Sequence, residues 1–360
     1  MGSSLFSISL STLLTLGSSA WGAELLHPQE VKPVTEARDI NVIVETLMTG
    51  VRAQFKKDGK ALRDVHSKHH GCVNGTFTVF DKLPAPYSVG LFAKAREYPA
   101  VARFSNGREF DDREGDVRGL GIKIMDVPGD KLLEDERDAK TQDFLFINHN
   151  RFFIKNNADY VSFIKATGQG NPFKFFLSWN PLNWHVSEML IVREIRNKVV
   201  KNPVESQYFT TVPSLMGETP AKFSLKPCKE QKYEYVTADK NQLGQALAAQ
   251  LLPGQDNKGV CFEFQVQLQT DPRRMSVEDS RPAWSEKLSK YKTVARLDIS
   301  AQDFLAVKDG DRICENLSLT PWHSLPEHRP LGNIQRARKA AYQQISILRH
   351  ELNKEKRQEP

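Results

Sequence analysis

The 360-residue sequence has only four cysteines and no CxxC pair, which excludes a zinc ribbon and a thioredoxin-type redox motif. Four cysteines allow three disulfide pairings, and their spacing does not choose among them. A chain of this length buries a sizeable core without disulfides, so disulfides are permitted by the sequence but not implied. The cysteines are Cys72, Cys228, Cys261 and Cys314.

The sequence also lacks a long block of basic residues. Its formal net charge of +6 is spread along the chain, apart from Lys354, Lys356 and Arg357 near the C-terminus. A nucleic-acid partner is therefore not expected, because such a partner requires a clustered basic face.

No apolar run is long enough to cross a membrane, and we expect no membrane span. The uncharged run at residues 5–16 is too short for one. Small residues follow it, and either Ser18 with Ala20 or Ala20 with Gly22 fits the small-x-small pattern that a signal peptidase recognises. No Lys or Arg precedes the run, which is atypical of a signal. We nevertheless predict a cleaved signal peptide at residues 1–22, a single domain at 23–360, and a periplasmic or secreted protein.

Regular hydrophobic patterns predict a mixed fold. Alternation of apolar and polar residues predicts strands, and longer helix-forming segments predict helices. No internal repeat or linker divides the chain, so we expect one α+β domain with an antiparallel sheet or barrel. The predicted strands are residues 76–80, 100–104, 121–125, 262–269 and 295–299, and the predicted helices are 157–166, 184–200 and 334–352.

Three histidines, His66, His69 and His70, lie within five positions. On a helix they would share one face and could bind a metal ion together with a further ligand. The β-branched Val65 and the strand pattern at 76–80 favour an extended segment instead, in which His69 and His70 point to opposite faces. A solvated basic turn is a third interpretation, and this segment alone does not choose among the three.

The predicted C-terminal helix places Arg338, Tyr342, Ile345 and Arg349 on one stripe, because they follow a spacing of four, three and four residues. A guanidinium one turn from a phenol stabilises the phenolate. A phenolate can be an anionic oxygen ligand to ferric iron. The alternative is a surface tyrosine with neighbouring charges.

Five motifs in the same chain order resemble the haem catalase superfamily, in particular its short, catalase-related peroxidase branch. The resemblance covers roughly residues 30–352. It implies a catalase-like antiparallel β-barrel core with surrounding helices and a C-terminal proximal haem-ligand helix, an α+β fold. The motifs are Arg63-Asp64-Val65-His66-Ser67-Lys68, the segment 99–105, the segment 118–124, the segment 148–155, and Arg338 with Tyr342 and Arg349.

The resemblance implies a b-type haem (heme b) as cofactor. Tyr342 would be the axial ligand of its iron, as in catalase, with Arg338 supporting the phenolate. Arg63, Arg103 and Arg349 would pair with the haem propionates, a task that suits bidentate arginine–carboxylate contacts. The residues that would narrow or line the haem pocket are Val65, Phe152, Phe153, Tyr160 and Phe163.

The resemblance also implies a peroxide site. His66 would move a proton between the two peroxide oxygens as general base and then acid, while Ser105 holds its ring. Asn148 would orient the peroxide, although its segment matches the family only with a one-residue gap and lacks a proline, so Asn150 is a rival. His69 and His70 would be bystanders near the rim of the site.

The expected activity is that of a haem peroxidase, which uses hydrogen peroxide or an organic hydroperoxide to oxidise a small organic donor. The sequence stops soon after the proximal helix, without the further segments of large catalases, which implies an open haem edge and favours this activity. The alternative is a true catalase. Val65 stands where hydroperoxide isomerases have threonine, and the presence of His66 with Asn148 argues against a non-catalytic haem carrier. The resemblance further implies a homo-oligomer.

Overall fold

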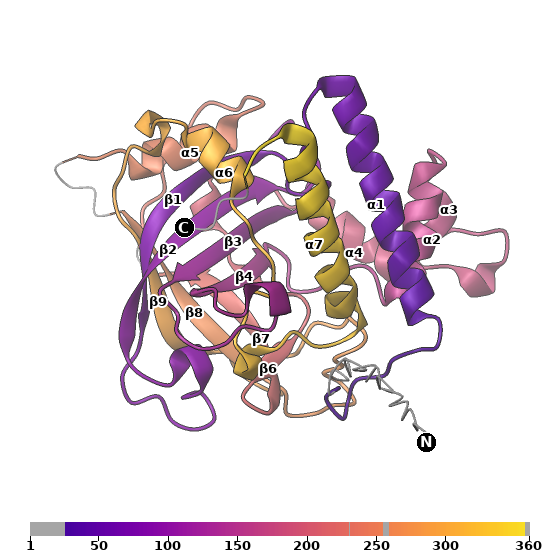
Figure 1. Cartoon of the computed structure of the whole chain (residues 1–360), viewed down its shortest axis with the longest axis horizontal. Helices are drawn as coiled ribbons and strands as arrows, with labels where there is room; N and C mark the ends of the chain where they lie inside the picture. The colour runs from indigo at the N-terminus through magenta and orange to yellow at the C-terminus, as the bar shows by residue number, and fades with distance from the viewer. Residues whose placement is uncertain (1–25, 230, 255–258, 357–360) are drawn as a thin grey trace, which may run out of the picture.

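The computed structural model describes residues 26–229, 231–254 and 259–356, so the expected signal peptide at 1–22 lies outside the described residues (Figure 1). Nine strands form one antiparallel sheet in the order β5-β4-β3-β2-β1-β9-β8-β7-β6. Because β5 also pairs with β7, eight of the strands close into a barrel, with β6 added beside β7. The strands are β1 (His69–Val79), β2 (Arg96–Asn106), β3 (Arg118–Met125), β4 (Thr141–Ile147), β5 (Tyr208–Phe209), β6 (Ser214–Met216), β7 (Thr219–Pro227), β8 (Val260–Leu268) and β9 (Lys292–Ile299).

Aromatic side chains fill the interior of the barrel. In β8, Phe262, Phe264 and Val266 alternate along the strand and all are fully buried, because successive residues of a strand point to opposite faces. The ring of Phe264 lies 5.3 Å from that of Phe77 and 4.9 Å from that of Phe144, each in an edge-on arrangement. Burial of one such ring stabilises the fold by about 1.5–3 kcal/mol. The barrel is therefore a packed core, and a cofactor must lie outside it.

Helices cover one flank of this barrel. Figure 1 shows α7 between α1 and the barrel, with α2 and α3 on the far side of α1 and with α5 and α6 at the upper edge. The predicted helix at 184–200 is shorter in the structure and ends at Arg196, before Asn202 caps a separate 3₁₀ turn. The helices are α1 (Glu36–Asp58), α2 (Asn157–Gly168), α3 (Phe173–Phe176), α4 (Val186–Arg196), α5 (Gln242–Leu251), α6 (Gly310–Asn316) and α7 (Asn333–Asn353). Among these described helices, none has the length and apolarity to cross a membrane.

Both cysteine pairs form disulfides, which the sequence left open. Cys72 in β1 is bonded to Cys314 in α6, so this small helix is tied to the barrel wall. Cys228 and Cys261 join the end of β7 to the start of β8. The first disulfide closes a loop of 242 residues and the second a loop of 33 residues. In the chain-entropy account, the longer loop gives the larger stabilisation.

Candidate functional site

The segment that precedes β1 carries His66 in an unusual backbone conformation. Its φ angle is 60°, in the left-handed region, and its N–H donates to the Gly107 carbonyl at 2.6 Å. The imidazole Nδ1 lies 3.0 Å from Ser105 Oγ in β2. A Cβ atom at Gly119 in β3 would lie 2.4 Å from the ring, so only glycine permits this approach. The ring is therefore held by β2 on one side and by the bare backbone of β3 on the other.

The imidazole of His66 is uncharged near neutral pH. Burial, and after it the positive charge of Arg103, lower its pKa to about 4. Arg103 also donates to the His66 carbonyl at 2.9 Å. A buried, neutral imidazole can accept a proton, as a general base must. The role of His66 as the working histidine stays a prediction.

Asn148 follows β4 and is held by the backbone of Arg118. Its Oδ1 accepts from the Arg118 N–H at 2.8 Å, and its own N–H donates to the Arg118 carbonyl at 2.9 Å. Its buried Nδ2 finds no hydrogen-bond partner among the described residues. The rival Asn150 is exposed. A buried donor without a partner is costly in a folded protein, so Asn148 is the asparagine that a bound ligand would satisfy.

The expected arginine–tyrosine pair is present on α7. Arg338 Nη2 donates to Tyr342 Oη at 3.0 Å, and its guanidinium carbon lies 5.1 Å from the centre of the tyrosine ring. A second contact to Gln335 Oε1 at 3.1 Å fixes the guanidinium. The helical spacing of four residues brings the two side chains together, as the sequence predicted. Tyr342 thus has the hydrogen-bond donor that stabilises a phenolate.

Arg103 and Arg349 face one carboxylate, that of Glu315 in α6, and Arg63 contacts the backbone at the end of the same helix. Arg349 forms an ion pair with Glu315, and Arg103 lies 3.6 Å from its second oxygen. Arg63 donates to the carbonyls of Glu315 and Leu317 at 3.0 and 2.6 Å. No pattern in the sequence pointed to Glu315, because it lies outside every motif and is brought to the site by α6 and its disulfide.

The three guanidinium groups carry more positive charge than Glu315 neutralises. Three positive charges and one negative charge leave a surplus of two, and burial lowers the pKa of each arginine, that of Arg349 to about 10. The Nε atoms of Arg63 and Arg103 are buried and have no partner in the described part of the chain. The cluster therefore suits a ligand with two carboxylates, which is the charge that haem propionates present.

Aromatic residues of the α2 region form an apolar wall. The rings of Phe153 and Phe163 meet edge-on at 5.0 Å, and those of Tyr160 and Phe163 stack at 6.4 Å. Burial raises the pKa of Tyr160 to about 12, so its phenol stays neutral. Val65, beside His66, is half-buried. These residues can provide a dry lining for a flat cofactor.

Direct contacts link the residues of the five motifs. Asn148 is bound to the backbone of Arg118, and the neighbouring Gly119 lies against the His66 ring. Arg103 donates to the His66 carbonyl and lies 3.6 Å from Glu315, which pairs with Arg349 on the helix of Tyr342. The structure therefore places residues of all five motifs in one connected group.

The three histidines do not form a metal centre. His70 was expected near the rim, but it is buried, and its Nε2 lies 3.0 Å from Asn106 Oδ1. The prediction was wrong because β1 turns His70 toward the β2–β3 loop, where Asn106 and Asp112 complete a polar network. His69, the first residue of β1, is half-buried.

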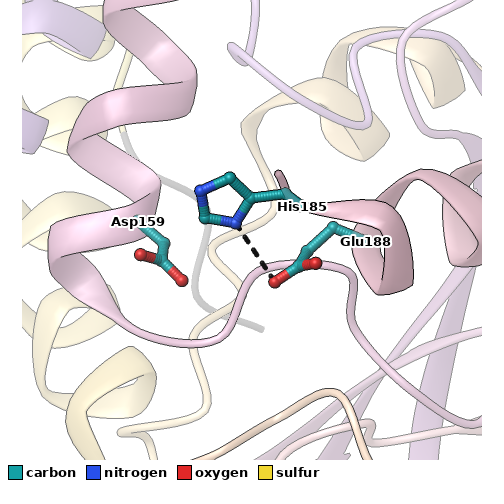
Figure 2. Close-up of side chains that lie close together, drawn as sticks. All are labelled: Asp159, His185 and Glu188. Carbon is teal, nitrogen blue, oxygen red and sulfur yellow. Dashed lines mark hydrogen bonds and ion pairs between the residues drawn. The ribbon is translucent and has the colours of Figure 1, made fainter. Parts of the chain in front are cut away.

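A different group of potential metal ligands was not apparent in the sequence. Asp159, His185 and Glu188 place ligand atoms within 4.8 Å of one another (Figure 2). His185 Nδ1 lies 3.3 Å from Glu188 Oε1, and Arg281 donates to the same oxygen at 2.7 Å. The guanidinium of Arg281 already supplies a cation to this carboxylate, so the geometry favours an ion-pair network over a metal centre.

Comparison with known proteins supports the predicted fold. No protein-family model matches the chain, and no curated protein matches its sequence. A fungal catalase is similar in structure at a TM-score of 0.60 and 15% identity, covering 84% of this chain and 63% of the fungal one. Catalase A from Saccharomyces cerevisiae is similar at a TM-score of 0.59 and 16% identity, covering 83% of this chain and 63% of the yeast one. A bacterial catalase is similar at a TM-score of 0.60 and 15% identity, covering 99% of this chain and 70% of the bacterial one.

The catalase-like fold predicted from the motifs is thus confirmed, an antiparallel barrel of eight strands with helices around it. The chain spans 63% of the length of the fungal and yeast catalases. At this level of identity the likeness concerns the fold alone.

Proposed function

We propose that this protein is a haem-dependent peroxidase that reduces hydrogen peroxide, or an organic hydroperoxide, with electrons from a small organic donor. The observation that supports this most is a set of direct contacts that joins His66 to helix α7. Arg103 donates to the His66 carbonyl and lies 3.6 Å from Glu315, which pairs with Arg349. The same helix carries the hydrogen-bonded pair of Arg338 and Tyr342.

The chain offers a complete set of contacts for a b-type haem. Tyr342 would be the ligand of the iron through its phenol oxygen, which Arg338 contacts at 3.0 Å. Arg63, Arg103 and Arg349 would hold the two propionates, whose charge matches the surplus of the arginine cluster. When bound, the haem supplies the redox capacity needed to cleave the O–O bond of peroxide.

The distal residues move the proton and orient the peroxide. Ser105 is hydrogen-bonded to Nδ1 of His66. This leaves Nε2 to take the proton from one oxygen of the peroxide and to deliver it to the other oxygen. Asn148 donates through its unpartnered Nδ2 to a peroxide oxygen. The overall reaction is H₂O₂ + 2 AH → 2 H₂O + 2 A•, in which each donor AH loses one electron and one proton.

A pocket beside the site supports the peroxidase over the catalase reaction. It has a volume of about 250 Å³, opens to solvent and is lined in part by Arg63 and Asp64, which come just before His66. An organic donor can approach there without entering the peroxide site.

The second candidate is a true catalase, 2 H₂O₂ → 2 H₂O + O₂, and the catalase fold of the structural neighbours favours it.

The two reactions differ in oxygen release. The haem-loaded chain is given hydrogen peroxide with and without a phenolic donor, and dioxygen is followed with an electrode. A peroxidase oxidises two donors per peroxide with little oxygen, whereas a catalase releases one dioxygen per two peroxides. His66→Ala should abolish either reaction, while Asn150→Ala, a change at the exposed rival, should leave it intact. Failure of the unaltered chain in both assays contradicts the proposal.

A further inference from the structure

The solvent-open pocket beside Arg63 has a distinctive arrangement of charge. It lies between α1, the segment that carries His66 and the loop after β2, and its volume is about 250 Å³. Half-buried Arg63 and Asp64 form its inner end, and exposed Arg108 and Phe110 form its mouth. The site residues and the pocket thus share one wall, since Arg63 belongs to both.

The guanidinium of Arg108 is available to a ligand. In the described part of the chain it makes no side-chain hydrogen bond and no ion pair within 4.0 Å. Its neighbour Glu109 is directed elsewhere, toward Arg196 at 3.9 Å. Burial raises the pKa of Asp64 and the charge of Arg108 opposes that shift, yet the two side chains form no ion pair within 4.0 Å. An arginine left unpaired at the mouth of a pocket suits a carboxylate.

The loop that carries Arg108 and Phe110 is held rigidly. Asp116 Oδ2 accepts from the backbone N–H groups of Arg108 and Glu109 at 2.7 and 3.0 Å. Lys68 Nζ donates to the Phe110 carbonyl at 2.8 Å, which ties the loop to the segment of His66. A preformed pocket binds at a lower entropic cost than one that must be ordered by its ligand.

Phe110 adds an apolar surface to this charge. Its side chain is 58% exposed, so the ring is accessible to a ligand at the mouth of the pocket. A ring stacked on Phe110 would place a carboxylate at one end toward Arg108 and a hydroxyl at the other end toward the Asp64 carboxylate. A phenol O–H is a donor that a carboxylate accepts.

We propose that this pocket binds the reducing substrate and that the substrate is a small phenol with a carboxylate tail. The proposal rests on the peroxidase function above and names its donor class. Arg108 binds the tail, Phe110 contacts the ring, and Asp64 accepts from the hydroxyl at the end of the pocket beside Arg63. A positively charged amine tail is disfavoured by the two arginines.

A pair of donors of opposite charge tests the proposal. 4-Hydroxyphenylacetate and tyramine share a phenol ring and differ in carrying a carboxylate or an ammonium group. With the haem-loaded full chain, we expect the carboxylate donor to have the lower KM. Arg108→Gln should raise that KM by about tenfold and leave the KM of tyramine unchanged or lower. Phe110→Ala should raise the KM of both donors.

Arg52→Gln is the matched control, because Arg52 is exposed on α1 beside the pocket without lining it. It removes the same charge and should change neither KM. Equal KM values for the two donors, or an Arg108→Gln enzyme indistinguishable from the unaltered one, would overturn the pocket assignment while peroxidase turnover stands.

Direct binding separates this proposal from the proposed function. Binding of 4-hydroxyphenylacetate to the haem-loaded full chain, measured by calorimetry without peroxide, should weaken about tenfold in Arg108→Gln. If binding depends on Arg108 but no donor is oxidised, the peroxidase function fails and the pocket remains a binding site. If donors are oxidised without such binding, the pocket assignment fails.

Discussion

At the scale of single residues, the site depends on one buried imidazole that stays neutral. The pKa of His66 is lowered to about 4, so the ring remains a base down to that pH. The same shift has a consequence for stability. The stabilisation that a neutral His66 contributes is present above the pKa of the unfolded chain, about 6.5, and is lost as the pH falls toward 4.

The rate of the reaction with peroxide should therefore be flat between about pH 5 and 8 and fall as the pH approaches 4. Stopped-flow measurement of the haem spectrum after mixing with peroxide checks this across the range. A fall in rate centred near pH 6.5, the pKa of an exposed histidine, would show that His66 is not the buried base. His66→Ala should remove this dependence of the rate on acid pH, together with most of the rate itself.

Gly119 is the second residue on which the imidazole depends. In Gly119→Ala the new methyl group would lie 2.4 Å from the His66 ring, so the ring must leave its contact with Ser105. We expect the rate with peroxide to fall at least tenfold, of the order that general-base catalysis contributes, with the propionate contacts intact.

Gly168→Ala is the control, because a Cβ atom at Gly168 meets no atom within 4 Å. It should keep the full rate. The same stopped-flow assay measures both variants, and their haem content is compared by absorption. If Gly119→Ala reacts as fast as Gly168→Ala, the ring position described here has no part in the reaction.

At the scale of elements, α6 is the part that connects the disulfides to the site. Its Glu315 carboxylate pairs with Arg349, and the carbonyls of Glu315 and Leu317 hold Arg63. Cys314, the residue before Glu315, ties α6 to β1. Helix α6 has only seven residues and begins with glycine, so its position depends on this bond more than on its own helical stability.

Replacing Cys72 and Cys314 together by alanine should lower the free energy of unfolding by about 2–5 kcal/mol. It should also weaken haem retention, because Arg63 and Arg349 lose their fixed partners.

The pair Cys228 and Cys261 is the control. Its removal should destabilise the chain without affecting haem retention, since no arginine of the site contacts that disulfide. Chemical unfolding and haem transfer to an acceptor protein measure the two effects. Equal loss of haem in both double variants would contradict this role of α6.

The elements themselves were predicted unevenly from the sequence. Five strands with clear alternation were found, and α7 was placed within one residue at each end. Helix α1 was missed because β-branched residues and Gly50 interrupt its pattern. Strand β4 was missed because it buries Gln142 and Asp143, whose partners His323, Lys123 and Ser324 are distant in the sequence.

At the scale of the whole molecule, the fold class was predictable because five motifs with strand and helix character follow one another in the order of a known barrel. The closure of the barrel was not predictable, since it depends on the two residues of β5 and on their pairing with both β4 and β7. The place of Glu315 in the site and the pocket beside Arg108 could not be predicted from the sequence either. Each depends on contacts between segments that carry no common motif.

The whole account depends on Tyr342 as the ligand of a haem iron. The measurement that tests this most directly is the absorption spectrum of the haem-loaded chain, produced from residue 24 onward, beside that of Tyr342→Phe. We predict a high-spin ferric spectrum with phenolate character in the unaltered chain and its loss in the variant. Identical spectra for the two proteins, or a chain that takes up no haem, would contradict the assignment of the site.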